Sequence, residues 1–461
     1  MSSKKSTKTR VAIIAIVIII AIIAVGIGMY LLKPAPAPAP VKELTLWEFG
    51  GIGSEHIYLP WLCKKFNEEH PTIKIKWEHK SWMEKRDILI SSFITGTAPD
   101  IVTQDTGSLG DFVEMGYYVP LDSMPGWEEV KKIFIPEAIE TVRYKDHYWG
   151  VPTYFDGAPF IAINVDAFKK AGLVDEKGNI LIPTTWEELI DYAKRAQEAN
   201  PGMVGFLFPV PTYNDMVMFE AIAYQNGARW RDPTTGFPVL NDTGWKSVAQ
   251  LYHDLVYKYK VSPEGVIDLD YYKVIMSFLD GKAAMALGLT WFRCIESEMN
   301  ITTPFKWVST LFPINTGKTY PRGKYPTVSM LMDPTTVFYI ISASKNREEA
   351  WEFIKWVALN GYIDKYGPGA PTGVPIYGRA PVTPKQWEDP KWQEAEPYLT
   401  KLYKEGKLFK GAEKMPTFRG IIELLEKYLP DTVKAVILGT KTADEAFEEL
   451  QKAAEKVLGY R

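Results

Sequence analysis

The stretch Gly150–Ala171, GVPTYFDGAPFIAINVDAFKKA, decides how the rest of the chain is organised. Its strand-like opening leads into an aromatic pair that begins at Tyr154, and then into Asp156, which small residues follow. Strand character returns at 160–163, before a helix that Gly172 ends. A strand, a short stiff crossing and a second strand indicate a place where the chain passes between two lobes. Because the crossing carries an aromatic ring and a carboxylate, it suits a polar ligand.

The length and composition of the chain favour a folded protein with two lobes. Its 461 residues exceed a single ordinary domain, and its 46% apolar and 24% charged residues are typical of globular proteins. Aromatic residues make up 13% of the chain, with 15 Trp, 25 Tyr and 21 Phe. Large cores explain most of them, and a cleft lined with aromatic rings is the more specific interpretation.

The first 40 residues predict a membrane segment that is not part of the fold. Four Lys or Arg residues in 1–10 precede an uninterrupted apolar run over 11–32. As a helix this run would be about 33 Å long, enough to cross a bilayer, with its basic end in the cytoplasm and the rest of the chain outside. The run is longer than a usual secretory signal, and neither a small-residue cleavage pattern nor a lipid-accepting Cys follows it. We therefore expect an uncleaved transmembrane anchor, with a cleaved signal peptide as the alternative.

A spacer at 33–42 separates this anchor from the soluble part of the chain. Pro and Ala alternate from Pro34 to Pro40, a composition that favours a stiff polyproline II segment. Residues 1–40 contain five Lys or Arg and no acid, so the net charge of −3 for the whole chain becomes −8 for residues 41–461. An acidic extracellular domain argues against a nucleic acid partner.

The chain has two cysteines, Cys63 and Cys294, and they fall in different predicted lobes. A disulfide bond between them would lock a hinge. We therefore expect free, buried thiols.

Strands and helices alternate after the spacer, which predicts an α/β fold with a parallel sheet and crossover helices. We expect strands at 44–49, 73–77 and 101–103, a helix that Pro60 begins and Asn67 ends, and a helix at 82–95 that Gly96 follows. Ligands in such sheets gather beyond the carboxyl ends of the strands. Four residues near the ends of the first and third strands are therefore candidates by position: Trp47, Ser54, Glu55 and Asp105.

A second alternation follows the crossing. We expect helices at 186–199, 215–225, 243–259 and 345–360, and strands at 205–208, 283–288, 307–311 and 336–341. Capping boxes of Thr184 with Glu187 and of Thr442 with Glu445 mark two helix starts. Trp291 opens a helix directly after the buried strand at 283–288, so its indole is expected beyond a strand end.

Nine phrases of the sequence occur in a characteristic order over residues 43–458. They are LTLWEF, KKFNEEHPTIKIKWE, GTAPDIVTQDTGSLGDFVEMGYYVPLD, the crossing stretch itself, PTTWEELIDYAKRAQ, YQNGARW, FLDGKAAMALGLTWF, SKNREEAWEFIKWVA and LGTKTADEAFEELQKAAEKV. In this order the chain resembles the extracellular solute-binding proteins of ABC importers, and within them the family 1 sugar-binding group that includes maltose-binding protein. Each phrase alone is a weak signal, but their joint order is a strong one.

The resemblance implies a periplasmic-binding-protein-like α/β fold with two hinged lobes. The N-lobe would comprise 43–154 with 310–366, and the C-lobe 157–307 with 370–461. The lobes would close on a sugar and deliver it to an ABC permease, without catalysis and without a cofactor or metal. We expect a monomer.

Three site residues carry over from the family to this sequence. Trp291 matches the stacking aromatic residue, Asp156 the acid of the hinge phrase and Asp105 the acid at the mouth of the first lobe. The chain also departs from the family pattern: Thr106 occupies the place of an Arg found in maltodextrin binders, and Ile163 that of a consensus Tyr. The glycine loop after the first strand also lacks a Lys. These departures argue against maltose itself rather than against a sugar.

The chemistry of a sugar fits these residue types independently of the family. A pyranose presents an apolar face of C–H groups and a ring of hydroxyls, so it needs a flat aromatic surface and planar acceptors. Trp291 would supply the surface, and Asp156 and Asp105 the acceptors, although a core Trp and turn carboxylates are the alternatives. Further candidates are the rings of Tyr154 and Trp47, followed by weaker ones for which surface or core roles suffice: Tyr213, Trp230, Tyr377 and Arg419.

Other chemistries have less support in the sequence. None of the five His residues forms a His-x-x-x-His spacing, and no nucleophile elbow, P-loop or dinucleotide fingerprint is present. Two alternatives remain: the same fold binding a polyamine, a peptide or an anion, and an anchored glycoside hydrolase. An anion would call for Arg or a helix amino terminus, whereas the acids expected in the cleft favour neutral or cationic ligands.

Overall fold

The structure is a computed structural model, and it describes residues 14–25, 40–50, 55–82, 84–154, 159–288, 291–325, 331–332, 336–360 and 380–460. The chain divides into two compact units, Met1–Lys42 and Glu43–Arg461.

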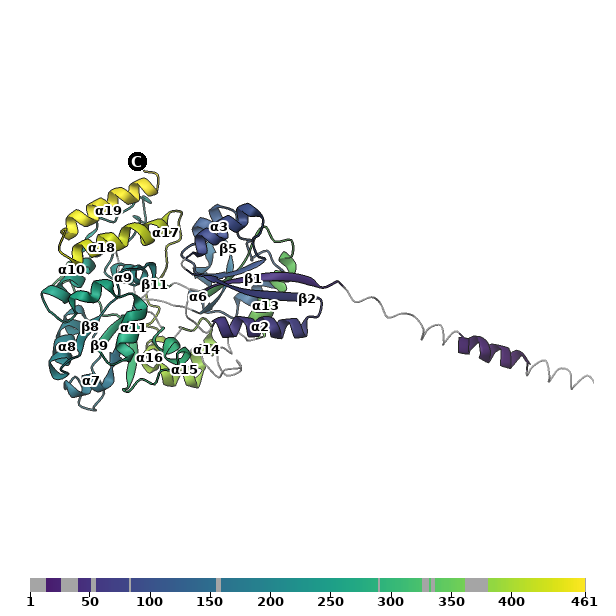
Figure 1. The fold of residues 1–461 in the computed structure, drawn as a ribbon, viewed down its shortest axis with the longest axis horizontal. Coiled ribbons are helices and arrows are strands. Elements are labelled where there is room, and N and C mark those ends of the chain that lie inside the picture. Colours follow the sequence, from purple (N-terminus) through teal and green to yellow (C-terminus); the bar gives the residue numbers. More distant parts are fainter. Residues whose placement is uncertain are drawn as a thin grey trace, which may run out of the picture. The chain divides into compact units, whose positions relative to one another are not determined.

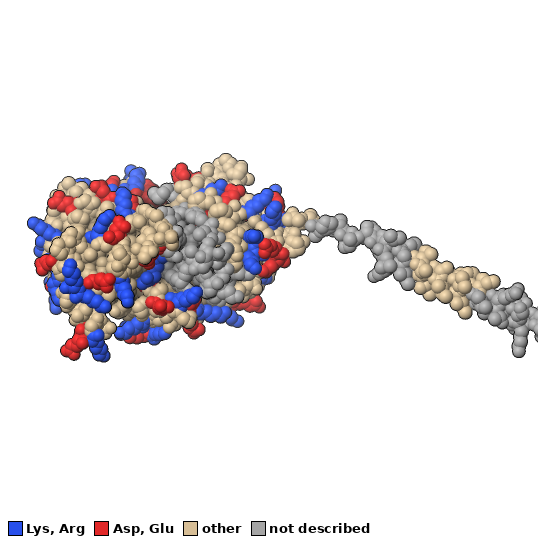
Figure 2. Space-filling view, turned by 60° about the horizontal axis from the view of Figure 1, so that its bottom comes forward, with Lys and Arg blue, Asp and Glu red and all other residues tan. Residues whose placement is uncertain are grey.

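The first unit contains a short apolar helix. Residues 14–25 are helical, and their Ile and Val side chains are exposed. Figure 2 shows this helix without any charged side chain. In the part of the chain that the structure describes, no helix has both the length and the apolar character needed to span a membrane. The predicted anchor at 11–32 lies only partly within that part.

The N-lobe is built on a five-stranded sheet in the order β2-β1-β3-β12-β6. Its strands are β1 (Lys42–Gly50), β2 (Ile73–Ser81), β3 (Ile101–Gln104), β6 (Gly150–Tyr154) and β12 (Thr336–Ile340). β1 and β3 are parallel, with Trp47 opposite Val102, as the alternation of strands and helices predicts. β12 is antiparallel to both β3 and β6, because it enters this sheet on the return of the chain from the C-lobe. The sheet is therefore mixed rather than wholly parallel.

Helices cover the N-lobe sheet. The longer ones are α2 (Glu55–Glu69), α3 (Lys85–Thr95) and α13 (Arg347–Leu359), and α2 packs against β2 and α13 (Figure 1). α3 ends at Gly96, as predicted, and the φ of 70° at this glycine forms a left-handed cap. Shorter elements are α4 (Leu109–Glu114), α5 (Trp127–Lys131), α6 (Pro136–Thr141), β4 (Arg143–Tyr144) and β5 (His147–Tyr148).

The helix predicted to begin at Pro60 begins earlier in the structure, so its predicted start was wrong: Pro60 lies inside α2 rather than in its first turn. Proline removes a backbone N–H from the helix and disturbs the preceding turn. Burial of Leu59, Leu62 and Phe66 holds the helix together across this position. Tertiary packing thus outweighs the local preference, as is usual for amphipathic helices.

The crossing stretch passes between the two sheets, as predicted. β6 belongs to the N-lobe sheet, whereas β7 (Phe160–Asn164) belongs to the C-lobe sheet. The crossing at 155–158, with the predicted ligand residue Asp156, lies outside the described residues. Asn164 then caps α7 (Val165–Lys170) by accepting a hydrogen bond of 2.9 Å from the backbone N–H of Ala167.

The C-lobe is built on a four-stranded sheet in the order β10-β7-β9-β8. β7 is antiparallel to both β10 (Trp307–Leu311) and β9 (Ala283–Gly288), and β9 is parallel to β8 (Val204–Leu207). The helices that follow these strands in the chain are α8 (Trp186–Ala199), α9 (Tyr213–Gln225), α10 (Thr243–Tyr257), η1 (Glu264–Asp268), α11 (Tyr271–Leu279) and α12 (Phe292–Glu298).

The C-terminal region adds further helices. α18 (Leu429–Ile437) and α19 (Ala443–Val457) pack against α10 and against each other (Figure 1). The remaining elements are β11 (Leu331–Met332), α14 (Pro384–Glu388), α15 (Pro390–Ala395), α16 (Pro397–Lys404), β13 (Glu413–Lys414), α17 (Ile421–Glu423) and η2 (Leu424–Tyr428).

One of the two predicted capping boxes is displaced by one residue. Thr185 caps α8 with Glu188, whereas the sequence predicted Thr184 with Glu187. The hydroxyl of Thr184 also donates to Glu188, over 2.7 Å, so two adjacent threonines share one carboxylate. The capping box of Thr442 with Glu445 on α19 is confirmed.

Each sheet anchors its own hydrophobic core, and the two cores together account for most of the aromatic residues. Cys63 is a free thiol buried in the N-lobe core, as predicted. Burial raises the pKa of this thiol to about 12, which keeps it protonated and unreactive at neutral pH. The side chain of Cys294 lies outside the described residues, and the residue limits of the two lobes stay predictions.

Candidate functional site

Asp105 follows the carboxyl end of β3, where the sequence predicted a ligand acceptor. Its Oδ1 accepts hydrogen bonds of 3.0 Å from both the backbone N–H and the hydroxyl of Ser108. Its Oδ2 accepts from Nζ of Lys85, and the two side chains are 0% and 5% exposed. Both carboxylate oxygens thus have protein partners, and the negative charge is neutralised by a buried cation.

Lys85 lies at the start of α3 between two aromatic rings. Its Nζ is 3.6 Å from the ring centroid of Trp82 and 5.0 Å from that of Tyr213. Trp82 belongs to the N-lobe and Tyr213 opens α9 of the C-lobe. The ammonium group therefore joins the two lobes through cation–π contacts as well as holding Asp105.

Two glycines bring the loop after β3 against the start of α9 and against residue 417. A Cβ on Gly107 would lie 2.5 Å from the hydroxyl of Tyr213, and a Cβ on Gly110 would lie 2.9 Å from the carbonyl carbon of Thr417. Only a residue without a side chain allows the Tyr213 hydroxyl to lie so close to position 107 and the backbone of Thr417 so close to position 110. Next to them, the backbone N–H of Gly420 donates to Asp111 over 3.1 Å.

Asp111 is the second carboxylate on this side of the N-lobe. Burial raises its pKa, while the hydrogen bond from Gly420 and the charges of Arg86 and Arg419 lower it. Arg86 lies 3.7 Å from its Oδ2. Arg419, a weak candidate by sequence, is thus placed near the loop after β3 rather than far from the predicted site.

A continuous series of contacts leads from Tyr213 to Trp291. Asp215, two residues along α9, accepts a hydrogen bond of 2.8 Å from the backbone N–H of Tyr271. The ring of Tyr271 packs edge-on against the indole of Trp291, with 4.9 Å between centroids. Trp291 is 9% exposed and directly precedes α12, close to the predicted helix start. The structure therefore connects Asp105 with Trp291 through Lys85 and the starts of α9 and α11, partly by side-chain contacts and partly through the backbone.

Three predicted aromatic residues lie elsewhere. Tyr154 is buried at the end of β6, where its hydroxyl bonds to the hydroxyl of Thr336. Trp47 is half-buried on β1 under the ammonium of Lys80, 4.6 Å away. Trp230 is 1% exposed in the C-lobe core, where its indole N–H donates to Glu220. Its burial fits a core role.

The remaining predicted residues have no described side chain. Glu55 is the first residue of α2, and only its backbone is described. Asp156, Ser54 and Tyr377 lie outside the described residues.

Comparison with known proteins identifies the family. Residues 54–363, well over half of the chain, match the family described as bacterial extracellular solute-binding protein. The chain belongs to this family of solute-binding proteins. The resemblance found in the sequence is thereby confirmed, and so is the expectation that the chain is not an enzyme.

Individual relatives of this solute-binding protein are distant. The maltotriose-binding protein of Pyrococcus abyssi is 25% identical over 305 residues, which cover 66% of this chain. The chain spans about 60% of the length of that relative.

Two solved structures share the fold. Maltose-bound MalE3 of T. maritima gives a TM-score of 0.73 at 22% identity and covers 90% of this chain and 99% of its own. An ABC substrate-binding protein of Listeria monocytogenes in complex with cycloalternan gives 0.72 at 19% identity, over 91% and 100%. These likenesses confirm a two-lobed, MalE-like α/β fold.

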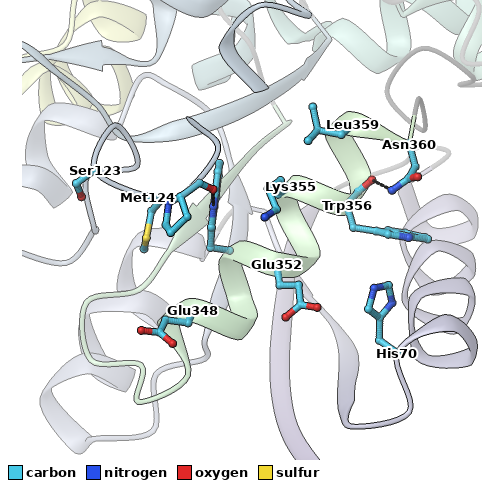
Figure 3. Close-up of a pocket in the computed structure, with 11 residues that line it drawn as sticks. His70, Ser123, Met124, Glu348, Glu352, Lys355, Trp356, Leu359 and Asn360 are labelled. Carbon is cyan, nitrogen blue, oxygen red and sulfur yellow. Dashed lines mark hydrogen bonds between the residues drawn. The ribbon is translucent and has the colours of Figure 1, made fainter. Parts of the chain in front are cut away.

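A cavity of about 610 Å³ lies away from this series of contacts, on the N-lobe of the solute-binding protein. Glu348, Glu352 and Lys355 project from α13 along it, and His70 lies across from them (Figure 3). Its two tryptophans, Trp351 and Trp356, are buried, and their indoles donate to Pro125 and Glu69. The residues that line this cavity belong to the N-lobe alone and are away from the contacts between the lobes, so we do not assign a sugar to it.

Lys85 and Trp82 were not among the predicted site residues. The predicted site comprised the loops after β1 and β3 but not the loop after β2, which contains Trp82 and leads into α3. The same rule on the carboxyl ends of strands, applied to β2, would have named both residues. No pattern in the sequence indicates the approach of residues 415–420 to the loop after β3.

Proposed function

We propose that this solute-binding protein is the membrane-tethered receptor of an ABC importer, and that it binds a sugar or short oligosaccharide between its two lobes and delivers it to the permease. The main support is the series of contacts from Asp105 through Lys85 and Tyr213 to Tyr271 and Trp291. It places the C-lobe rings of Tyr213, Tyr271 and Trp291 in one series with an ion pair of the N-lobe, in a chain whose family binds solutes. Aromatic faces are what the C–H face of a pyranose requires.

The charge of this region supports a neutral ligand. The buried pair of Lys85 and Asp105 has no net charge. It therefore attracts neither an anion nor a polyamine. On the face shown in Figure 2, Lys, Arg, Asp and Glu side chains are interspersed over the second unit. The relatives support the same class of ligand, since their names and titles refer to maltotriose, maltose and cycloalternan.

A thermal-shift screen of residues 41–461 tests the proposed ligand class. At 100 times its Kd a ligand stabilises the folded state by about 2.7 kcal/mol, which raises the melting temperature by about 3–5 °C for a chain of this size. We expect such a shift from at least one saccharide, without release of reducing sugar. Spermidine and a peptide mixture are the comparison arms. A shift with either of these and none with any saccharide would contradict the proposal.

We further propose that residues 11–32 anchor the protein in the membrane. The support is the exposed apolar surface of residues 14–25, four preceding basic residues and the Ala-Pro spacer behind them. The full chain should sediment with membranes and resist extraction at high salt and at alkaline pH, whereas residues 41–461 should stay in solution. Intact mass of the membrane-bound chain should include residues 1–40. A soluble product that lacks them would support a cleaved signal instead.

A further inference from the structure

Asp215 is a fully buried carboxylate at the start of α9, and its two oxygens bond in different directions. Oδ2 accepts a hydrogen bond of 2.6 Å from the backbone N–H of Thr212, which closes the first turn of its own helix. Oδ1 accepts one of 2.8 Å from the backbone N–H of Tyr271, the first residue of α11. One side chain therefore joins the starts of two helices that are 56 residues apart in the chain.

Both helix starts carry aromatic rings of the candidate site. Tyr213 opens α9 and lies under the ammonium of Lys85. Tyr271 opens α11 and packs edge-on against Trp291, at an interplanar angle of 79°. The Asp215 carboxylate itself contacts neither Trp291 nor Lys85 in these bonds. It acts on the rings through the backbone of the residues that carry them.

We infer that Asp215 is a positioning residue of the ligand site, which fixes the spacing between Tyr213 on α9 and the Tyr271–Trp291 pair at α11. The inference rests on the proposed function, because it assumes that these rings contact the ligand. The capping box of α9 alone would not require a carboxylate at its third position, since an amide oxygen also accepts the hydrogen bond from the backbone N–H of the N-cap residue. The second carboxylate oxygen of Asp215 accepts the additional hydrogen bond from the backbone N–H of Tyr271.

The environment of Asp215 makes this link sensitive to pH. Burial raises the pKa of the carboxyl to about 7, the hydrogen bonds from Thr212 and Tyr271 oppose that rise, and the charge of Asp270 adds to it. The hydroxyl of Tyr252 on α10 also interacts electrostatically with the Asp215 carboxylate. Protonation converts one acceptor oxygen into a hydroxyl, so one of the two backbone bonds weakens below about pH 7.

Asp215→Asn tests the inference, because asparagine keeps one acceptor oxygen and mimics the protonated acid. We expect it to lower the affinity for the sugar found in the screen by about tenfold at pH 8, as one charge-assisted hydrogen bond is lost. Wild-type affinity should fall towards that of the variant between pH 8 and pH 6, while the affinity of the variant stays flat. A pH profile that is the same in both proteins would overturn the inference.

Asp270→Asn is the matched control. Asp270 also caps α11, through a hydrogen bond of 2.9 Å from the backbone N–H of Lys273, but this bond stays within one helix. The control should retain affinity at pH 8. Its pH profile should keep the wild-type shape with the midpoint at a lower pH, because the charge of Asp270 adds to the raised pKa of Asp215. Equal losses in Asp215→Asn and Asp270→Asn would show that α11 only needs a cap, and would overturn the inference.

A measurement without sugar separates this inference from the proposed function. The protein is labelled with 5-fluorotryptophan, and the fluorine resonance of Trp291 is identified by its absence in Trp291→Phe. In unliganded protein at pH 8, this resonance should shift in Asp215→Asn relative to the wild type, and it should not shift in Asp270→Asn. In the wild type it should also shift when the protein is titrated through pH 7. An unchanged resonance would overturn the positioning role. A shift in a protein that binds no saccharide would support positioning and overturn the proposed ligand class instead.

Discussion

Trp291→Ala is expected to lower the affinity for the sugar by more than about 100-fold, equivalent to about 2.8 kcal/mol, while the chain stays folded. The indole is the largest flat surface at the end of the contact series that begins at Asp105. Alanine leaves no ring for the C–H face of a pyranose, and it also removes the partner of Tyr271. Calorimetric titration measures the affinity, and far-UV circular dichroism with a melting curve checks the fold.

Two variants separate binding from stability in this experiment. Trp291→Phe keeps a flat ring and should retain part of the affinity. Trp230→Phe changes a tryptophan of the same lobe that is 1% exposed and donates to Glu220, so it should lower the melting temperature and leave the affinity unchanged. Unchanged affinity in a folded Trp291→Ala protein would refute the assignment of Trp291 to the site.

Most of the fold could be predicted because its signals are local. The strand at 283–288, the helix end at Gly96 and the capping box at Thr442 follow from periodicity and residue type, and the structure has all three. The passage between lobes at the crossing stretch was predictable for the same reason. Pro60 shows the limit of such rules, since the buried face of α2 overrides its preference for a first turn.

The site was less predictable, because its geometry depends on contacts between distant residues. Asp105 was correctly expected near a strand end, but nothing in its neighbourhood indicates that Lys85 neutralises it. The sequence likewise places Asp215 in a helix without indicating its bond to Tyr271. Pairings of this kind are set by how α3 meets β3 and how α9 meets α11, which local sequence patterns do not encode.

The pair of Lys85 and Asp105 is expected to have the largest effect on stability in the chain, because removing one partner leaves the other charge buried. We expect Asp105→Asn and Lys85→Met each to lower the free energy of unfolding by about 3–5 kcal/mol. In the first variant the ammonium keeps its contacts with Trp82 and Tyr213. In the second the carboxylate keeps its hydrogen bonds from Ser108.

The double variant Lys85→Met with Asp105→Asn decides whether charge is the cause. It contains no buried charge at this position, so its free energy of unfolding should return to within about 1–2 kcal/mol of the wild-type value, although both single variants are weakened. Lys76→Met is the matched control, since Lys76 pairs with Glu43 where both side chains are 49% exposed, and it should change stability by less than about 1 kcal/mol. Urea unfolding at 25 °C measures all four proteins against the wild type. Simple addition of the two single effects in the double variant would show that the residues contribute by packing, and that the ion pair does not hold the loop after β3 in place.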